Sequence, residues 1–294
     1  MSKDLAASVR ARLLNLAKAE QSDFNGVLLR YALERMLYRL GQSAHAQRFV
    51  LKGAMLFTLW YDMPHRPTRD VDLLGFGPKD LESVARTFRE IAAMEVAEDG
   101  IVFDPASVAA EDIRKEAGYA GARVYIDGEL AGARLRTQVD IGFGDAVTPG
   151  PVPAVYPVML GEFPAPQLRT YPVYTVVAEK LHAIALLGMT NTRMKDYLDL
   201  AVIFERETLD VETLTEAIAA TFTRRGMAVP TELPKGLSDE FAADATRQKL
   251  WQAFLNKNQL ELQPLHEVVT ALRERLQAAL PQAVLVHARH VQKT

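Results

Sequence analysis

Residues 51–74, LKGAMLFTLWYDMPHRPTRDVDLL, combine a glycine turn with a pair of acids and predict the start of an α/β core. Lys52-Gly53-Ala54 has the small residues of a tight turn, and the apolar segment after it predicts a helix to about Tyr61. A strand is predicted next, and it carries Asp70 and Asp72. Because side chains two apart in a strand project from the same face, both carboxylates are expected on one side of a sheet.

The acidic pair and the turn together favour phosphate chemistry. Mg²⁺ accepts one or two carboxylates and leaves its other positions to water and to phosphate oxygens, which a nucleoside triphosphate supplies. A turn that leads into a helix offers backbone N–H groups to phosphate charge. The layout is typical of a nucleotidyl transfer site, although an isolated Asp-x-Asp is more commonly a structural or surface feature.

Composition indicates an ordinary globular protein. The 294 residues are 49% hydrophobic and 24% charged, enough for two domains or for one core with a helical appendage. The absence of cysteine excludes disulfides and thiolate metal sites. No signal-peptide pattern is visible at the N-terminus and no segment approaches the ~20 apolar residues of a membrane span, so a cytoplasmic protein without a membrane partner is expected. The net charge of -3 disfavours a broadly basic surface, but a local basic groove stays possible.

Three parts are predicted along the chain. Residues 1–48 have helical periodicity and are expected to form an N-terminal helical cap. Residues 49–172 are expected to form the α/β core, and residues 173–294 a C-terminal helical domain. Prolines crowd residues 148–172, which favours an ordered crossover or linker over regular helix.

A third carboxylate is expected to reach the acidic pair from a later strand. A helix at about 78–94 is followed by strands at 118–126 and 133–141, with a turn at Asp127-Gly128 that makes them an antiparallel hairpin. Asp140 lies at the end of the second strand. It is therefore predicted to converge with the two acids of the first segment.

Two helices after the proline-rich segment carry polar residues in apolar surroundings. Residues 175–189 are apolar apart from Glu179, Lys180 and His182, which predicts a buried helix whose polar groups have specific partners. Because desolvating a lysine is costly, Lys180 is expected either to face a substrate anion or to pair with a buried acid. His182 is interpreted as a core residue and not as a ligand.

The next helix begins after residues 190–192 and offers a second group of charges. Arg193 and Asp196 are three residues apart and share a helix face. Asp196 is therefore placed to orient a cation or to contact a nucleotide. Lys195 and Asp199 are interpreted as a separate, structural pair at i, i+4.

Five motifs occur in order along the chain: Leu51-Lys52-Gly53, Arg66-Pro67-Thr68-Arg69-Asp70-Val71-Asp72-Leu73, Val139-Asp140, Glu179-Lys180-Leu181-His182-Ala183 and Arg193-Met194-Lys195-Asp196-Tyr197-Leu198-Asp199-Leu200. Together they resemble the AbiEii/AbiGii family of toxin nucleotidyltransferases, which includes the MenT toxins. The resemblance covers about 49–204. The family's turn commonly continues with Gly or Ser and then a hydroxyl residue, where this chain has Ala54 and Met55. Its phosphate contacts are therefore expected to differ.

The resemblance implies an α+β fold with a minimal nucleotidyltransferase core of the polymerase-beta type. This core has a mixed sheet and is flanked by the helical cap and the helical domain. The implied activity is Mg²⁺-dependent transfer of a nucleotide from an NTP to an RNA acceptor, most often the 3′ end of tRNA, with one or two ions. The implied setting is a toxin–antitoxin or abortive-infection system against phage, with a winged-helix antitoxin that needs no stable direct contact.

The same resemblance implies roles for individual residues. The catalytic residues are expected to be Asp70, Asp72, Asp140, Lys180 and Asp196. Those expected to bind metal are Asp70, Asp72 and Asp140. Those expected to bind the nucleotide are Lys52, Gly53, Ala54, Thr68, Arg69, Lys180 and Arg193.

Two other functions stay open. A nucleotidyltransferase that modifies a protein hydroxyl or a small molecule should close a deep neutral pocket, whereas an RNA reader should gather basic residues beside the acids. The basic residues considered are Arg134, Arg136, Arg193, Lys195, Arg224 and Arg225. A non-catalytic binding or regulatory protein that keeps the fold is the third possibility, supported only by Ala54 and Met55.

Overall fold

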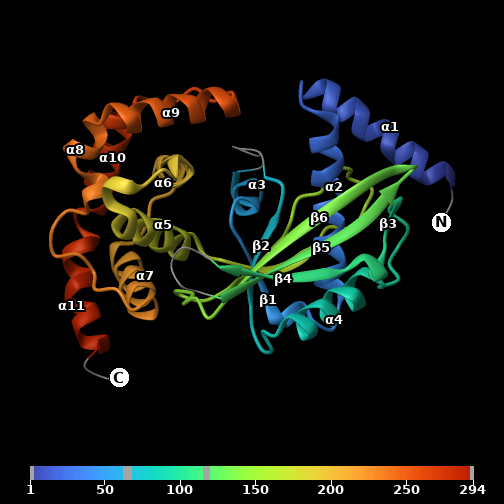
Figure 1. Cartoon of the computed structure of the whole chain (residues 1–294), viewed down its shortest axis with the longest axis horizontal. Coiled ribbons are helices and arrows are strands. Elements are labelled where there is room, and N and C mark those ends of the chain that lie inside the picture. Colours follow the sequence, from blue (N-terminus) through green and yellow to red (C-terminus); the bar gives the residue numbers. More distant parts are fainter. Residues whose placement is uncertain (1–2, 62–67, 115–119, 292–294) are drawn as a thin grey trace. The chain divides into compact units, whose positions relative to one another are not determined.

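A computed structural model describes residues 3–61, 68–114 and 120–291 (Figure 1). The chain forms two compact units. Unit 1 contains Met1–Gly144 and Val152–Thr170, and unit 2 contains Asp145–Pro151 and Tyr171–Thr294. The chain therefore passes from one unit to the other three times. Residues 1–48, predicted as a helical cap, belong to the same unit as the sheet.

The described residues of unit 1 form an eight-stranded mixed sheet. Its strands are β1 (Phe49–Lys52), β2 (Val71–Gly75), β3 (Ile101–Phe103), β4 (Ala109–Arg114), β5 (Ala120–Leu130), β6 (Ala133–Phe143), β7 (Val152–Val155) and β8 (Gln167–Thr170). The order is β3-β5-β6-β2-β1-β8-β7, and β4 pairs with β5 beside this path. β2 is parallel to β6 and antiparallel to β1. The α+β class predicted from the sequence is confirmed.

The first segment has the predicted order of turn, helix and strand, but the strand does not include Asp70. α3 (Met55–Tyr61) follows the turn at Gly53, and β2 begins at Val71. Asp72 therefore lies within the strand, and Asp70 lies one residue before it.

The β5–β6 hairpin forms, but the predicted position of its turn is wrong. Asp127 and Gly128 continue β5 and pair with β6. The chain reverses instead at Ala131 and Gly132, whose φ angles are 47° and 80°. Two successive positive φ angles give the twist that a two-residue hairpin loop requires. The longer strands also bring Leu130 into the core, where it is fully buried.

The two faces of the sheet differ in polarity. On β6, Val139 and Ile141 are buried and alternate with polar side chains. α2 (Phe24–Gln42) and α4 (Leu81–Ala92) pack against the sheet. Phe88 of α4 contacts Phe49 of β1, with ring centroids 5.5 Å apart, which places α4 on the apolar face. Charged side chains are left on the opposite face, as the strand periodicity of two requires.

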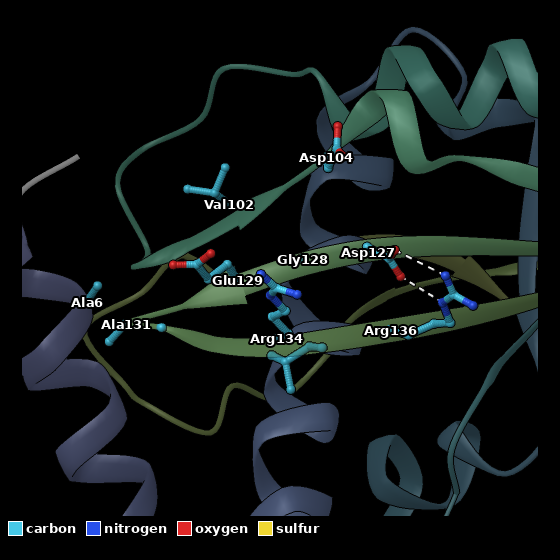
Figure 2. A pocket seen from close by; sticks show the side chains of 11 residues that line it. Ala6, Val102, Asp104, Asp127, Gly128, Glu129, Ala131, Arg134 and Arg136 are labelled. Atoms are coloured by element: carbon cyan, nitrogen blue, oxygen red, sulfur yellow. Dashed lines mark hydrogen bonds and ion pairs between the residues drawn. The ribbon is translucent and has the colours of Figure 1, made fainter.

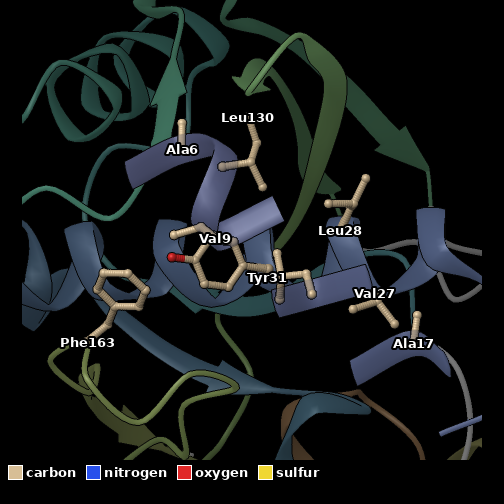
Figure 3. Close-up of a cluster of buried hydrophobic side chains, with 9 residues drawn as sticks. Ala6, Val9, Ala17, Val27, Leu28, Tyr31, Leu130 and Phe163 are labelled. Carbon is tan, nitrogen blue, oxygen red and sulfur yellow. The ribbon is translucent and has the colours of Figure 1, made fainter. Parts of the chain in front are cut away.

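α1 (Lys3–Ala19) packs on α2 and closes a separate cluster of buried residues (Figure 3). The cluster contains Ala6, Val9, Leu13, Ala17, Val27, Leu28, Tyr31, Leu130 and Phe163. The Tyr31 hydroxyl donates to the Asp99 backbone oxygen at 2.6 Å, and Arg39 of α2 pairs with the Asp99 carboxylate at 2.7 Å. The N-terminal helices are thus attached to the sheet near the end of the β5–β6 hairpin.

The proline-rich segment contains regular structure. β7 and β8 both lie within it and pair antiparallel. β7 is at the edge of the sheet, where Pro153 can be tolerated because an outer strand needs fewer N–H donors. Residues 156–166 join these two strands within unit 1, and residues 148–151 and 171–172 belong to unit 2.

The described part of unit 2 is helical. Its helices are α5 (Val173–Leu187), α6 (Met194–Arg206), α7 (Val211–Arg224), α8 (Asp239–Ala243), α9 (Ala245–Asn258), α10 (Leu265–Leu276) and α11 (Ala279–Val291). α5 packs against α6 and α7, and α7 packs against α11. Residues 145–151 also belong to this unit. Within them, Thr148 exchanges hydrogen bonds with Thr175 of α5 at 2.9 and 3.0 Å.

One described helix, Val173–Thr190, is long and apolar enough to cross a membrane by length and composition alone. Its mean hydropathy is 1.2, and 44% of it is buried. The expectation that no segment approaches such a length therefore fails on this criterion. The evidence for a span is weak, because a core helix passes the same test, and α5 buries Val177, Leu181 and Ile184 within unit 2.

Candidate active site

A row of charged residues crosses the polar face of the sheet in unit 1. Lys52 of β1 lies opposite Asp72 of β2, which lies beside Asp140 of β6. Asp140 lies opposite Arg123 of β5, which in turn lies opposite Glu111 of β4. Directly opposed residues have Cβ atoms about 4.5–5.5 Å apart. Each of the two adjacent acids therefore has a basic neighbour on its other side.

Gly53 leaves the space in which the Asp72 carboxylate lies. Its φ is 76°, a conformation that residues with a Cβ rarely adopt. A Cβ at this position would lie 2.1 Å from Asp72 Oδ2 and 2.7 Å from Asp72 Cγ. The glycine of the predicted turn is thus required both for the backbone and for the position of the acid.

Asp70 is held by the residue that begins the described segment. The Thr68 hydroxyl donates to Asp70 Oδ1 at 2.9 Å. Arg69, between them, is exposed. Arg66, which belongs to the same sequence motif, lies outside the described residues. Thr68 therefore positions a predicted metal ligand, and its contact with a nucleotide stays a prediction.

Arg123 holds Asp140 through both carboxylate oxygens. Arg123 Nε donates to Asp140 Oδ1 at 2.8 Å and Nη2 donates to Oδ2 at 2.7 Å. Gln138 Nε2 donates to Oδ1 at 3.1 Å. The Asp140 side chain is only 9% exposed. These hydrogen bonds raise the pKa of Arg123 further above its ordinary value, so the pair is ionic.

A second charged cluster lies within unit 2. Lys180 Nζ of α5 donates to Asp199 Oδ2 at 2.5 Å and to Asp196 Oδ1 at 3.2 Å, both on α6. Arg193 Nε donates to Asp196 Oδ2 at 2.7 Å. Burial raises the pKa of Asp196, but the charges of Lys180 and Arg193 outweigh it and hold that pKa below its ordinary value. Two cations and two anions thus balance in this cluster.

The sequence matches a known family over most of its length. The family model described as nucleotidyl transferase AbiEii toxin, type IV toxin–antitoxin system, covers residues 35–280. The chain belongs to the AbiEii family. It is accordingly a nucleotidyltransferase of a toxin family. The match extends beyond the 49–204 expected from the motifs and includes residues of both units.

Two solved structures match the AbiEii chain along most of its length at low sequence identity. A *Helicobacter pylori* protein described as a candidate nucleotidyltransferase is 15% identical, with a TM-score of 0.43, over 90% of this chain and 95% of its own. JHP933 from *Helicobacter pylori* is 17% identical, with a TM-score of 0.44, over 89% of this chain and 94% of its own. No curated protein matches the sequence.

The acidic pair of the AbiEii chain fits a divalent cation better than the predicted trio does. Asp70 and Asp72 are two residues apart, and Mg²⁺ needs only one or two protein carboxylates when phosphates complete its ligands. Asp140 differs, because Arg123 already engages both of its oxygens. Among residues 3–61, 68–114 and 120–291, no group of three or more His, Cys, Asp or Glu side chains is arranged to hold a metal ion.

Lys180 has the acidic partners that were one of its two predicted environments. Its second partner, Asp199, was interpreted as part of a structural pair with Lys195, whereas Asp199 is fully buried against Lys180. The i, i+3 spacing could have predicted this position of Asp199, because residues 196 and 199 share a helix face just as 193 and 196 do. Asp199 therefore belongs with the candidate site residues of unit 2.

His182 lies in the core of unit 2, as predicted. Its ring packs edge-on against Phe222 of α7, with centroids 5.0 Å apart. Burial and the nearby charge of Arg225 lower the pKa of His182 to about 4. Arg225 also pairs with Asp145 at 3.2 Å and with Glu179 at 3.0 Å. Glu179, next to Lys180 in the sequence, therefore belongs to a separate cluster of ion pairs with Arg225.

A hollow of about 1040 Å³ lies at the turn end of the β5–β6 hairpin and not at the acidic pair (Figure 2). Arg134 and Arg136 line it, and Arg136 forms two hydrogen bonds with Asp127, at 2.7 and 3.1 Å. These arginines lie six and four residues before Asp140 on β6, about 20 and 13 Å along the strand. These two arginines therefore do not contribute to a basic surface beside the acids.

Proposed function

We propose that this nucleotidyltransferase transfers a nucleotide from an NTP to an RNA acceptor, the 3′ end of tRNA, and so blocks translation. The observation that carries the proposal is the Asp72 carboxylate, seated over Gly53 and next to Asp140 on the polar face of the sheet. Asp70 and Asp72, two residues apart beside a glycine turn, are suited to a cation that carries triphosphate oxygens. Family membership supplies the reaction class.

In the proposed reaction, an acceptor hydroxyl oxygen forms a bond to the α-phosphorus of the NTP. The bond from that phosphorus to the bridging oxygen breaks, and pyrophosphate leaves. The hydroxyl proton passes to solvent. Asp70 and Asp72 hold the divalent cation, which when bound neutralises charge on the phosphates. Thr68 keeps Asp70 in position through its 2.9 Å hydrogen bond.

Family resemblance alone is the ground for proposing that Lys180 and Arg193 neutralise charge on the triphosphate. The Arg193 side chain is 45% exposed, and its Nε donates to the buried Asp196 at 2.7 Å. Lys180 is 14% exposed and fixed by two buried acids. Both side chains are therefore fixed in place before a nucleotide arrives. Asp196 acts on the reaction by orienting these two cations.

RNA is preferred as the acceptor because the chain belongs to a toxin family. A small-molecule enzyme would be supported by a deep neutral pocket over the acids. The large hollow at the hairpin turn has a charged lining and lies some distance from them. The proposed setting is the cytoplasm, in a phage-defence system whose winged-helix antitoxin needs no stable contact with the toxin.

The proposal is tested by incubating the purified protein with each α-³²P-labelled NTP, Mg²⁺ and total RNA. Label is expected in the tRNA fraction with at least one NTP. Asp70→Asn should abolish labelling. The matched control is Asp127→Asn, the same substitution on the same face of the sheet but at an exposed ion pair far from the acids, and it should label normally.

Other outcomes decide between the functions. Label in protein or in a small molecule, with RNA unlabelled, would favour the second kind of acceptor. No transfer with any NTP, or equal labelling by Asp70→Asn, would contradict the proposal. Chelation of divalent ions with EDTA should stop the reaction, and added Mg²⁺ should restore it.

A further inference from the structure

The hydrogen bonds around Asp140 suggest that this residue has a role other than metal binding. A carboxylate has about four lone-pair positions for hydrogen bonds. Three are used here, two by Arg123 and one by Gln138. The guanidinium lies parallel to the carboxylate in the two-point geometry that is the strongest form of this pair. A cation that took Asp140 as a ligand would have to displace this arrangement.

The charges of the row of residues on the polar face also argue against Asp140 as a metal ligand. Asp140 lies beside Asp72 in register and opposite Arg123, so Arg123 places a positive charge two strands away from Asp72, with Asp140 between them. A fixed positive charge at this distance repels a divalent cation, and the effect is moderate because Arg123 is 30% exposed. Arg123 thus both occupies Asp140 and lowers the negative charge of the site.

We propose that Arg123 is a positioning residue that holds the Asp140 carboxylate in an ion pair. It keeps Asp140 from binding the cation, so the cation meets the carboxylates of Asp70 and Asp72 only. It also limits how tightly the site binds a free divalent ion before the nucleotide arrives. This inference rests on the proposed function for the identity of the cation site, and it replaces the three-carboxylate site expected from the sequence.

The competing arrangement makes a different prediction. If Asp140 is a third ligand and the cation displaces Arg123, then removing Asp140 should weaken binding as removal of Asp72 does. If Arg123 holds Asp140 in an ion pair, then removing Arg123 should free a third carboxylate and strengthen binding of the divalent cation. The two arrangements therefore predict different effects of removing Asp140.

The experiment measures Mn²⁺ binding to the full chain by calorimetry, without nucleotide. Arg123→Gln is expected to bind Mn²⁺ about tenfold more tightly than the natural protein. Asp140→Asn should change the affinity by less than about threefold, and Asp72→Asn should weaken it at least about tenfold. The double variant Arg123→Gln/Asp140→Asn should lose most of the gain, because the freed carboxylate is absent.

A matched control separates a local effect from a change in net charge. Arg136 forms the same two-point pair with Asp127 on the same two strands, four residues before Asp140 on β6. Arg136→Gln removes the same charge, so it should leave Mn²⁺ affinity within about twofold of the natural value. An equal gain in both variants would overturn the inference.

Other results also decide the question. Arg123→Gln that binds Mn²⁺ no more tightly than the natural protein, or Asp140→Asn that weakens binding as Asp72→Asn does, overturns the inference. Failure of both the natural protein and Arg123→Gln to bind Mn²⁺ overturns it too. The proposed function is judged separately, by RNA labelling. If Arg123→Gln does not fold, Arg123→Lys keeps the charge but loses the two-point geometry, and a threefold or larger gain in affinity is still expected.

Discussion

Substituting Gly53 with alanine tests how closely the turn and the acid depend on each other. The added Cβ would lie 2.1 Å from Asp72 Oδ2, far inside van der Waals contact. The Asp72 carboxylate would have to move by about 1 Å, and a displacement of that size at a catalytic group can cost on the order of 10²-fold in rate. Gly53→Ala should therefore lower RNA labelling by roughly that factor.

The backbone contributes a separate cost that a second variant isolates. An L residue in the left-handed region costs about 1–2 kcal/mol, and Gly53 has a φ of 76°. Gly132 has a φ of 80°, and a Cβ there would meet nothing within 4 Å. Gly132→Ala should lose about 1–2 kcal/mol of stability, or about 2–8 °C in melting temperature, and keep its transferase activity.

Two measurements on Gly53→Ala and Gly132→Ala separate the backbone cost from the displacement of Asp72. Thermal unfolding measures the shared backbone cost, and labelling of RNA by the α-³²P NTP measures the displacement of Asp72. Gly53→Ala should unfold at a lower temperature than Gly132→Ala because it also carries the steric clash. Equal labelling by the two variants, at temperatures where both are folded, would refute the link between the turn and Asp72.

Three further predictions concern stability. Arg39→Met should destabilise the protein by about 3–5 kcal/mol, because it leaves a buried carboxylate unpaired, whereas Arg89→Met, at an exposed pair, should cost under about 1 kcal/mol in denaturant unfolding. Lys180→Met should cost about 3–5 kcal/mol at pH 7 and less at pH 5, where a carboxylate without its cation can take up a proton; an equal loss at both pH values would contradict this. Folding lowers the pKa of His182 from 6.5 to about 4, so the unfolded chain binds the proton first and stability should fall as pH drops from about 6.5 toward 4. His182→Phe should flatten this part of the melting-temperature profile, and the exposed His266→Gln should not.

Much of the fold follows from local patterns in the sequence. The order of turn, helix and strand in residues 51–74 depends on glycine, apolar periodicity and alternation, all of which act between near neighbours. The buried α5 and the charged start of α6 were predictable for the same reason. Local patterns also predicted the strand that carries Asp72, whereas Asp70 lies one residue before it.

The partner of Asp140 was not predictable in the same way. In an antiparallel hairpin the paired residue numbers have a constant sum, which is 263 for β5 and β6. A turn at Asp127-Gly128 gives a sum of 255 and would pair Asp140 with position 115. Moving the turn by four residues moves the partner by eight, to Arg123. The role of Asp140 therefore depended on a long-range register that one misplaced turn obscured.

The path of the chain between the two units limits how the protein can be divided. A fragment starting at Val173 would lack Asp145–Pro151, and with it the Thr148 partner of Thr175 and the Asp145 partner of Arg225. A fragment ending at Gly144 would lack β7 and β8. During synthesis, residues 145–151 leave the ribosome before the last strands of the sheet and must wait for α5 to be made. Neither unit is therefore a single stretch of the gene, and exchanging one with a relative would require two segments to be replaced together.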